Sequence, residues 1–237
     1  MKGLKIYQSK WHILFVSLLV VIPFLFLLFF AEISQTATSS LLYDVFISFV
    51  RLCIAYGISA TLGWVLAVAF YKGTRGSVAL PVFDVLQSFP TYAALPLAVL
   101  YFGRSSVIVV FFLVLAIVWP IFFSITSSLK LIRKDWNEAV EISGLSGLAY
   151  VRLFLMPISI PGLITGSIIG LGDGWEALVA TEIIVGVKGG LGGFFQYFSS
   201  DPRVTALGIF GLLLIIFSIN KLVWLPLLEW SHRKVMD

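Results

Sequence analysis

The sequence predicts an all-α membrane protein with six transmembrane helices in a single domain that covers residues 1–237. The first observation is composition: 59% of the residues are hydrophobic and 12% are charged, about half the charged fraction of a soluble globular domain. The second is that long stretches of the chain contain no charged residue. This composition excludes a disordered chain, which needs low hydrophobicity and high charge, and it argues against an ordinary soluble enzyme.

Six apolar segments are long enough to cross a bilayer, which takes about 20 residues in a helix. Uninterrupted runs such as IPFLFLLFF, residues 22–30, lack the alternation of a transmembrane β-strand. The first segment exceeds the length of a signal-peptide core and no clear cleavage site follows it, so we expect a retained helix. The expected spans are 11–31, 45–71, 79–102, 105–129, 156–182 and 205–228.

Basic residues indicate the orientation, because they accumulate in the cytoplasmic segments of membrane proteins. With a cytoplasmic N-terminus, the external segments hold only Arg104, Lys188 and Arg203. The cytoplasmic segments then hold Lys2, Lys5, Lys10, Lys72, Arg75, Lys130, Arg133, Lys134, Arg152, Arg233 and Lys234. We therefore expect both termini in the cytoplasm. The sequence pI of 9.2 reflects this topology, since no basic block with interleaved aromatic residues indicates a nucleic-acid partner.

The longest cytoplasmic segment, residues 130–155, is expected to fold as a helix–turn–helix. Asp135 followed by Glu138 resembles a capping box, and Gly144 suits a left-handed helix stop. Ser146 can cap a second short helix that leads to the fifth span. From amphipathicity alone, a docking element for a partner and a loop that lies on lipid headgroups both remain open.

This loop resembles the EAA motif of ABC importer permeases, which reads Glu-Ala-Ala, three residues, Gly, nine residues and Ile-x-Leu-Pro. In the present sequence Val140 replaces the second alanine, while other apolar residues replace the isoleucine and leucine. The residues that keep the spacing are Glu138, Ala139, Val140, Gly144 and Pro157. We expect Pro157 and Pro161 at the start of the fifth span, where a missing N–H costs little.

The resemblance extends to the nitrate/sulfonate/taurine group of these permeases and covers the chain from about Asp44 to Trp224. Three further stretches are similar to that group, namely residues 86–103, 118–129 and 161–184, with Trp175 and Glu182 at matching positions in the last. The sequence departs from the group at Gln87, Asp173 and Glu176. These departures bear on the identity of the substrate and leave the family unchanged.

The resemblance implies the transmembrane subunit of a type I ABC importer with the MetI-like permease fold, in the inner membrane of a prokaryote. It implies a second permease subunit, identical or homologous, a cytoplasmic ATPase dimer and an extracytoplasmic substrate-binding protein. This chain has no phosphate-binding Gly-x4-Gly-Lys-Ser/Thr loop, so ATP and Mg²⁺ belong to the ATPase. We expect no catalytic residue, metal site or cofactor in the chain itself, and a small solute resembling nitrate, a sulfonate or taurine as substrate.

The same resemblance implies that the 130–155 loop is a coupling helix seated on the ATPase. In that arrangement Gly144 allows the sharp turn, Glu138 caps the helix and pairs with bases of the ATPase, and Ala139 permits a close approach. The residues expected to couple the subunits are Asp135, Glu138, Ala139, Val140, Gly144 and Pro157.

Ionisable residues inside membrane spans are costly and are therefore candidates for function. Asp173 and Glu176 are three residues apart and share one helix face. Either this face borders the translocation pathway or the subunit interface, or its carboxylates form internal ion pairs with Arg51 or Lys221. Asp84 is expected near the membrane surface. The candidates for the pathway or subunit interface are Arg51, Asp84, Asp173, Trp175, Glu176 and Glu182.

Two features of the fifth span and the segment after it leave alternatives open. The span carries a small-x-x-x-small stripe of glycines, which permits close helix packing either with a second subunit or within the chain. The members of this stripe are Gly162, Gly166, Gly170, Gly172 and Gly174. The aromatic side chains of the following segment either contact a docking binding protein or anchor the chain at the membrane interface; they are Phe194, Phe195, Tyr197 and Phe198.

Two other classes of transport protein are the alternatives to an ABC permease. A secondary transporter commonly has two inverted halves, and the halves of this sequence show no similarity. A transmembrane component of an energy-coupling-factor transporter also uses cytoplasmic coupling helices, but the EAA spacing argues against it.

Overall fold

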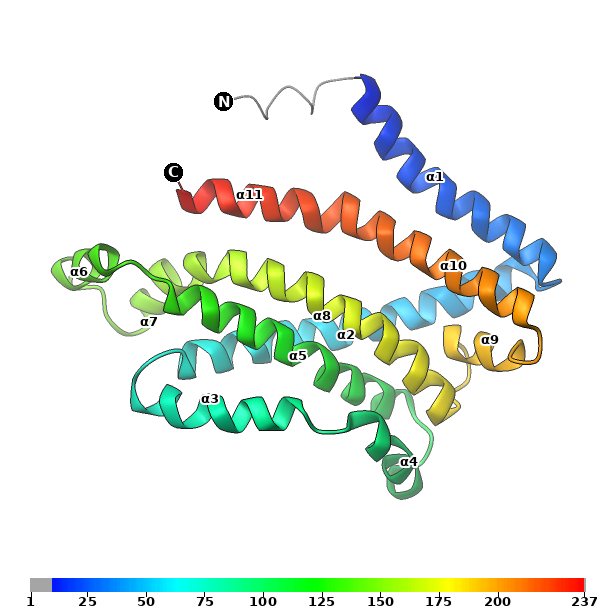
Figure 1. The fold of residues 1–237 in the computed structure, drawn as a ribbon, viewed down its shortest axis with the longest axis horizontal. Coiled ribbons are helices and arrows are strands. Elements are labelled where there is room, and N and C mark those ends of the chain that lie inside the picture. The colour runs from blue at the N-terminus through cyan, green and yellow to red at the C-terminus, as the bar shows by residue number, and fades with distance from the viewer. Residues whose placement is uncertain (1–9, 237) are drawn as a thin grey trace.

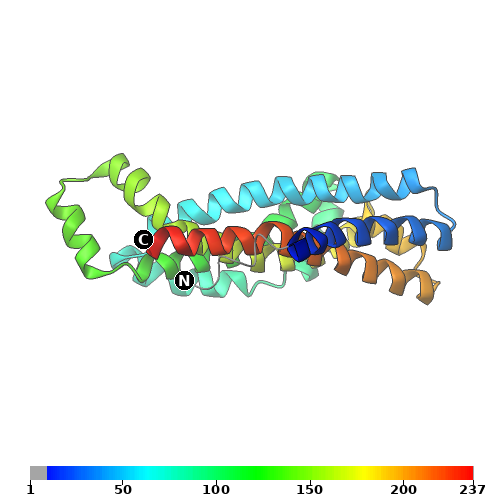
Figure 2. The same ribbon diagram turned by 90° about the horizontal axis from the view of Figure 1, so that it is seen from above.

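A computed structural model describes residues 10–236 as a bundle of helices without β-strands in that part of the chain (Figures 1 and 2). Short π-helical segments, Val151–Leu155 and Asn220–Trp224, join α7 to α8 and α10 to α11. The α-helices are α1 (Lys10–Ile33), α2 (Thr38–Phe70), α3 (Gly73–Gln87), α4 (Thr91–Phe102), α5 (Ser106–Lys130), α6 (Lys134–Ile142), α7 (Gly147–Tyr150), α8 (Met156–Val185), α9 (Leu191–Tyr197), α10 (Pro202–Ile219) and α11 (Leu225–Met236).

Within the described residues, five helical stretches are long and apolar enough to cross a membrane, and one bent pair of helices meets the same test as a sixth. The bent pair is α3 and α4, whose axes differ by 75°. The expectation of one continuous third span over residues 79–102 is therefore wrong. Pro90, which precedes α4, lacks an N–H and disfavours helical geometry at the residue before it, so the helix breaks there.

The expectation that Pro157 lies at the start of the fifth span is confirmed for the α-helix, since α8 begins at Met156 with a proline in its first turn, but the helical stretch itself begins earlier. Helical structure runs without a break from Gly147 to Val185, so Pro157 lies inside a longer helix, directly after the π-helical turn of residues 151–155. Proline cannot donate the usual hydrogen bond to the residue four positions earlier. π-Helical turns are rare and occur mostly as single turns inside longer helices, as here. Pro161 likewise lies within α8.

The glycine stripe of α8 packs against α5 of the same chain, which decides between the two interpretations of that stripe. A Cβ atom at Gly166 would lie 2.6 Å from the Cα of Ile121, and one at Gly162 would lie 2.7 Å from the carbonyl oxygen of Ser124. These distances show backbone-to-backbone contact between the helices. Gly172 does not belong to this contact, because a Cβ atom there would meet nothing within 4 Å.

Polar side chains join α2 to α8 within the bundle. The indole Nε1 of Trp64 donates to Ser159 Oγ at 2.8 Å, and the hydroxyls of Tyr56 and Ser167 lie 3.0 Å apart. The two pairs have the same spacing on both helices. They pair half-buried side chains of α2 with buried hydroxyls of α8, and so they set the rotation of one helix against the other.

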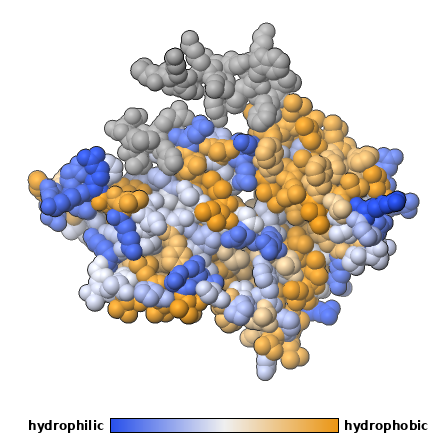
Figure 3. Space-filling model, viewed as in Figure 1, coloured by the Kyte–Doolittle hydropathy of each residue, from blue (hydrophilic) through white to orange (hydrophobic). Residues whose placement is uncertain are grey.

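Loops and charges divide between the two ends of the bundle. The α6–α7 segment and the end of α11 lie at one end, whereas α9 and the end of α1 lie at the other (Figure 1). Hydrophobic side chains cover much of the upper right of the visible surface, over α1 and α10, while hydrophilic residues gather over α6 (Figure 3). Many large apolar side chains of α1 and α2 are exposed. This is the surface that a lipid-facing bundle requires.

Alanine substitutions at Gly166 and Gly172 test the α5–α8 contact. Both variants gain about 1 kcal/mol of helix propensity relative to glycine. Gly166→Ala also overpacks a backbone contact, which costs about 1–3 kcal/mol. We expect Gly166→Ala to lower the midpoint of thermal unfolding of the purified subunit in detergent and Gly172→Ala to leave it equal or higher. Equal midpoints for the two variants would contradict this packing.

Candidate functional site

The α6–α7 segment projects from one end of the bundle as a small helical hairpin (Figure 2). Neither helix contains a buried residue. At its tip, two large apolar side chains face away from the protein: Ile142 is 89% exposed and Leu148 is 80% exposed. An exposed apolar tip on an otherwise charged helix is typical of a surface that another protein covers.

Gly144 terminates α6 as predicted, with φ of +70°, a left-handed conformation that glycine adopts without a steric penalty. The expected capping box is wrong. Because α6 begins at Lys134 and its N-cap is Arg133, Asp135 lies in the first turn, where an acid is favourable beside the helix N-terminus. Its carboxylate accepts hydrogen bonds of 3.1 and 2.7 Å from Arg133, and Glu138 lies 3.7 Å from the Lys134 ammonium.

The remaining residues of the motif lie on α6 and in the first turn of α8. Ala139 is exposed and Val140 is half-buried on α6, while Pro157 is exposed beyond the π-helical turn. Ser146 is the N-cap of α7 as expected, although its side chain makes no capping hydrogen bond. The motif therefore covers an accessible surface and the point where that surface joins α8.

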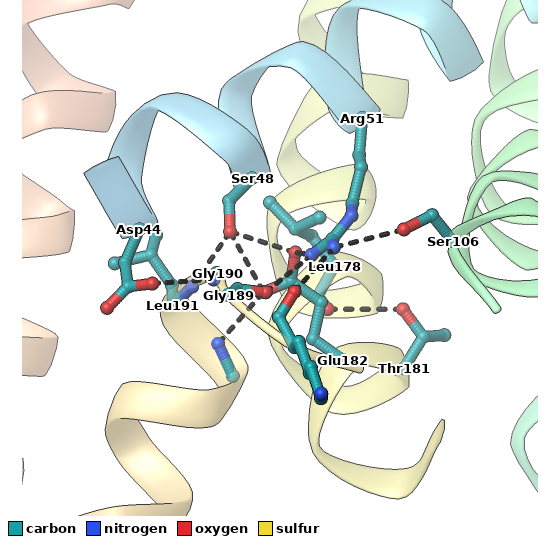
Figure 4. A network of polar contacts seen from close by, with 12 residues as sticks. Asp44, Ser48, Arg51, Ser106, Leu178, Thr181, Glu182, Gly189, Gly190 and Leu191 are labelled. Atoms are coloured by element: carbon teal, nitrogen blue, oxygen red, sulfur yellow. Dashed lines mark hydrogen bonds and ion pairs between the residues drawn. The ribbon is translucent and has the colours of Figure 1, made fainter. Parts of the chain in front are cut away.

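A second cluster of polar residues joins α2 and α8 to the loop between α8 and α9 (Figure 4). Arg51 Nη1 and Glu182 Oε1 form an ion pair at 2.6 Å. The carboxylate of Glu182 has no exposed surface and also accepts hydrogen bonds from Ser48 Oγ at 2.8 Å and from the Gly192 N–H at 2.9 Å. Arg51 therefore pairs with Glu182, and not with Asp173 or Glu176, an internal pairing that is one of the two alternatives left open by the sequence.

This ion pair holds the loop between α8 and α9. The Arg51 guanidinium donates to the carbonyl oxygens of Gly189 at 2.9 Å and Lys188 at 3.3 Å. The Leu191 N–H donates to Ser48 Oγ at 2.8 Å and the Gly190 N–H donates to an Asp44 carboxylate oxygen at 2.9 Å (Figure 4). A stripe of α2 side chains thus satisfies the loop backbone. A Cβ atom at residue 190 would lie 2.6 Å from Glu182 Oε2, so the loop needs glycine there.

The sequence interpretation missed Asp44, Ser48 and Ser106, whose hydroxyl accepts a hydrogen bond of 3.1 Å from Arg51 Nη2. A signal for two of them was present. Asp44, Ser48 and Arg51 recur at the spacing of one helix face, in a segment that is otherwise apolar. Ser106 follows a chain turn at the start of α5, and no periodicity in the sequence links it to α2.

Asp173 and Glu176 form a third group, on the face of α8 that does not pack on α5. Both are exposed, and neither forms a hydrogen bond or an ion pair with another described residue. Tyr92 of α4 lies within electrostatic range of both carboxylates. Lys221 does not pair with them either, since its ammonium lies over the ring of Phe217, 5.8 Å from the centroid.

The other two candidates lie apart from this group. Trp175 is 6% exposed and belongs to the hydrophobic core. Asp84 is exposed near the end of α3, where its carboxylate accepts a hydrogen bond of 2.7 Å from Gln87. The structure thus separates the six predicted pathway or interface residues into a buried ion pair, a core tryptophan, an acid bonded within α3 and an exposed acid pair.

Breaking the buried ion pair is expected to destabilise the fold. Glu182→Leu leaves the Arg51 guanidinium buried without a counter-ion, which costs about 3–5 kcal/mol, whereas the double variant Arg51→Met, Glu182→Leu is less destabilised. The control is Asp135→Asn, because its ion pair with Arg133 is exposed and such pairs contribute about 0–1 kcal/mol. Thermal unfolding of the purified subunit measures all three. A double variant less stable than Glu182→Leu would contradict the pairing.

The sequence is similar to several permease proteins of known transport systems. A nitrate import permease protein, NrtB of Leptolyngbya laminosa, is 30% identical over 188 residues, which cover 77% of this chain and 66% of that protein. The bicarbonate transport system permease protein CmpB of Synechococcus elongatus is 26% identical over 203 residues, covering 82% and 71%. The taurine transport system permease protein TauC of Escherichia coli is 31% identical over 109 residues, covering 46% and 40%.

The match spans 66% and 65% of the length of two nitrate permeases, those of Leptolyngbya laminosa and Synechocystis. The family model described as binding-protein-dependent transport system inner membrane component matches residues 59–225. That range includes the C-terminal part of α2, both helices of the projecting hairpin, the exposed acid pair of α8 and Glu182. On the strength of this match over most of its length, the chain belongs to the family of binding-protein-dependent transport system inner membrane components.

Proposed function

We propose that this chain is the transmembrane subunit of an ATP-driven ABC importer and forms part of the translocation pathway for a small solute. The observation that carries the proposal is the α6–α7 hairpin, which keeps the EAA spacing and projects an exposed surface from one end of the bundle. Family membership supports this function over a secondary transporter or an energy-coupling-factor component. It also makes the chain a transport subunit and not an enzyme.

The partners follow from the same proposal. A cytoplasmic ATPase dimer, which binds ATP and Mg²⁺, contacts the hairpin through the face that includes Glu138 and Ala139. A second permease subunit, identical or homologous, completes the pathway, and an extracytoplasmic binding protein delivers the solute. The hairpin and both termini then lie in the cytoplasm. The separation of basic residues supports this orientation, because Lys130–Lys134 lie at the hairpin end while Lys188 and Arg203 lie at the other.

The exposed acid pair supports a role for α8 at the pathway. A carboxylate facing lipid hydrocarbon is strongly unfavourable, so acids within a membrane span face water or another protein segment. Asp173 and Glu176 are exposed on one face of α8 and form no hydrogen bond or ion pair with another described residue. We propose that this face borders the pathway or the second subunit.

The names of the relatives suggest a small anion or zwitterion such as nitrate, bicarbonate or taurine as the solute. One observation favours a second candidate, a neutral or cationic solute: the two carboxylates repel an anion that passes near them. The two candidates predict opposite effects when the acids are neutralised, so the charge of the solute can be tested directly.

Substitution of Gly144 tests the ATPase contact. We expect Gly144→Asp to abolish co-purification with the ATPase and ATP-dependent uptake, because an aspartate there strains the turn and adds charge to the contact surface. Gly103→Asp is the control: Gly103 has a similar positive φ of +76° and open surroundings but lies between α4 and α5, at the other end of the bundle. Loss of the ATPase in both variants, or in neither, would overturn the assignment of the hairpin.

Neutralising the acid pair tests the pathway. In Asp173→Asn, Glu176→Gln, we expect uptake of a cationic solute to fall by roughly tenfold, equivalent to about 1.4 kcal/mol, and uptake of an anion to rise. The control is Glu32→Gln, which removes an exposed acid of α1. Initial uptake rates in proteoliposomes that contain the complete transporter measure the effect. Uptake rates equal to those of the control would contradict the placement of both acids at the pathway.

A further inference from the structure

Two tyrosines and a lysine connect the base of the α6–α7 hairpin to the corner between α2 and α3. Tyr71 and Lys72 form that corner, and Tyr150 is the last residue of α7. The hydroxyls of Tyr71 and Tyr150 lie 3.0 Å apart, and Lys72 Nζ donates to the Tyr150 hydroxyl at 3.4 Å. The same ammonium lies 5.2 Å from the ring centroid of Tyr71 and 5.5 Å from that of Tyr150, within the range of cation–π interactions.

The α2–α3 side of this cluster is closely packed. Tyr71 is buried. A Cβ atom at Gly76 of α3 would lie 2.5 Å from the carbonyl oxygen of Phe70, the last residue of α2. Phe83 of α3 contacts the rings of Phe70 and of Phe122 in α5, with centroid distances of 5.3 and 5.1 Å. Tyr71 therefore lies beside a tight backbone contact between the end of α2 and α3.

The hairpin side of the cluster is irregular. Tyr150 directly precedes the π-helical turn of residues 151–155, and its ring contacts that of Phe154 at 5.4 Å. A π-turn in a helix often marks a functional site. The hairpin has no buried residue of its own, so its angle to the bundle depends on this turn, on its connection to α5 and on side-chain contacts such as those of Tyr150.

We propose that Tyr150 and Lys72 are positioning residues that hold the α6–α7 hairpin at a set angle to the bundle, so that its displacement moves α3 and the bend between α3 and α4. The inference rests on the proposed function, in which an ATPase displaces the hairpin. Without the cluster, the same displacement would be absorbed by the π-helical turn. Fewer solute molecules would then be transported for each ATP hydrolysed.

The chemistry of the cluster keeps this contact intact near neutral pH. The neighbouring Tyr71 hydroxyl raises the pKa of Lys72, so the ammonium keeps its charge. Burial raises the pKa of Tyr71, so its phenol stays protonated and can donate to Tyr150. A cation between two neutral rings and a phenol–phenol hydrogen bond are thus present together.

The test is the number of solute molecules transported per ATP hydrolysed, measured in proteoliposomes with the complete transporter and its binding protein. Tyr150→Phe keeps the ring and removes the hydroxyl, and Lys72→Met keeps most of the length and removes the charge. We expect both variants to assemble with the ATPase and to lower the ratio several-fold. Lys72→Arg, which keeps a cation over the rings, should stay near the wild-type ratio.

Matched controls separate the cluster from general effects. Tyr197→Phe removes the hydroxyl of an exposed tyrosine on α9, and Lys130→Met removes an exposed charge at the end of α5. A wild-type number of solute molecules per ATP in Tyr150→Phe and Lys72→Met would overturn the inference. So would a decrease of this number in Lys72→Arg as large as that in Lys72→Met. Failure of the proposed function gives a different result: Gly144→Asp would then retain the ATPase, whatever the ratio in the cluster variants.

Discussion

The absence of water from the bilayer core is the constraint on which the rest of this structure depends, because each polar group there needs a partner within protein. The constraint divides the intramembrane charges into two kinds. Arg51 and Glu182 satisfy each other and the backbone of the loop after α8, so they form part of the framework. Asp173 and Glu176 have no such partners in the described chain, which leaves that face of α8 incomplete without water or another subunit.

The two faces of α8 therefore have different roles. Glycines bring one face into backbone contact with α5, and the Trp64–Ser159 and Tyr56–Ser167 hydrogen bonds fix it against α2. These contacts place that side of the helix in the core of its own subunit. Asp173 and Glu176 stay exposed on the same helix, at a place set by the rotation that the glycines and hydroxyls impose.

The same helix connects the two ends of the molecule. One end of its helical stretch carries the projecting hairpin through the π-helical turn, and the other end carries the glycine loop that the Arg51–Glu182 pair holds. The bend between α3 and α4 gives the bundle a second irregular element, and the Tyr71–Lys72–Tyr150 cluster places the start of α3 beside the base of the hairpin. A movement of the hairpin thus has a contiguous route to a helix that is already broken.

The sequence by itself determined the helical class, the approximate spans, the turn at Gly144 and the family motif, because these depend on local composition and on short spacings along the chain. It also indicated that Asp173 and Glu176 share a face. Only the tertiary structure decided that Arg51 pairs with Glu182, 131 residues away, that the glycine stripe faces α5, and that the third span is bent. Those outcomes depend on how each helix is rotated and tilted against its neighbours, and close packing between distant segments sets that rotation.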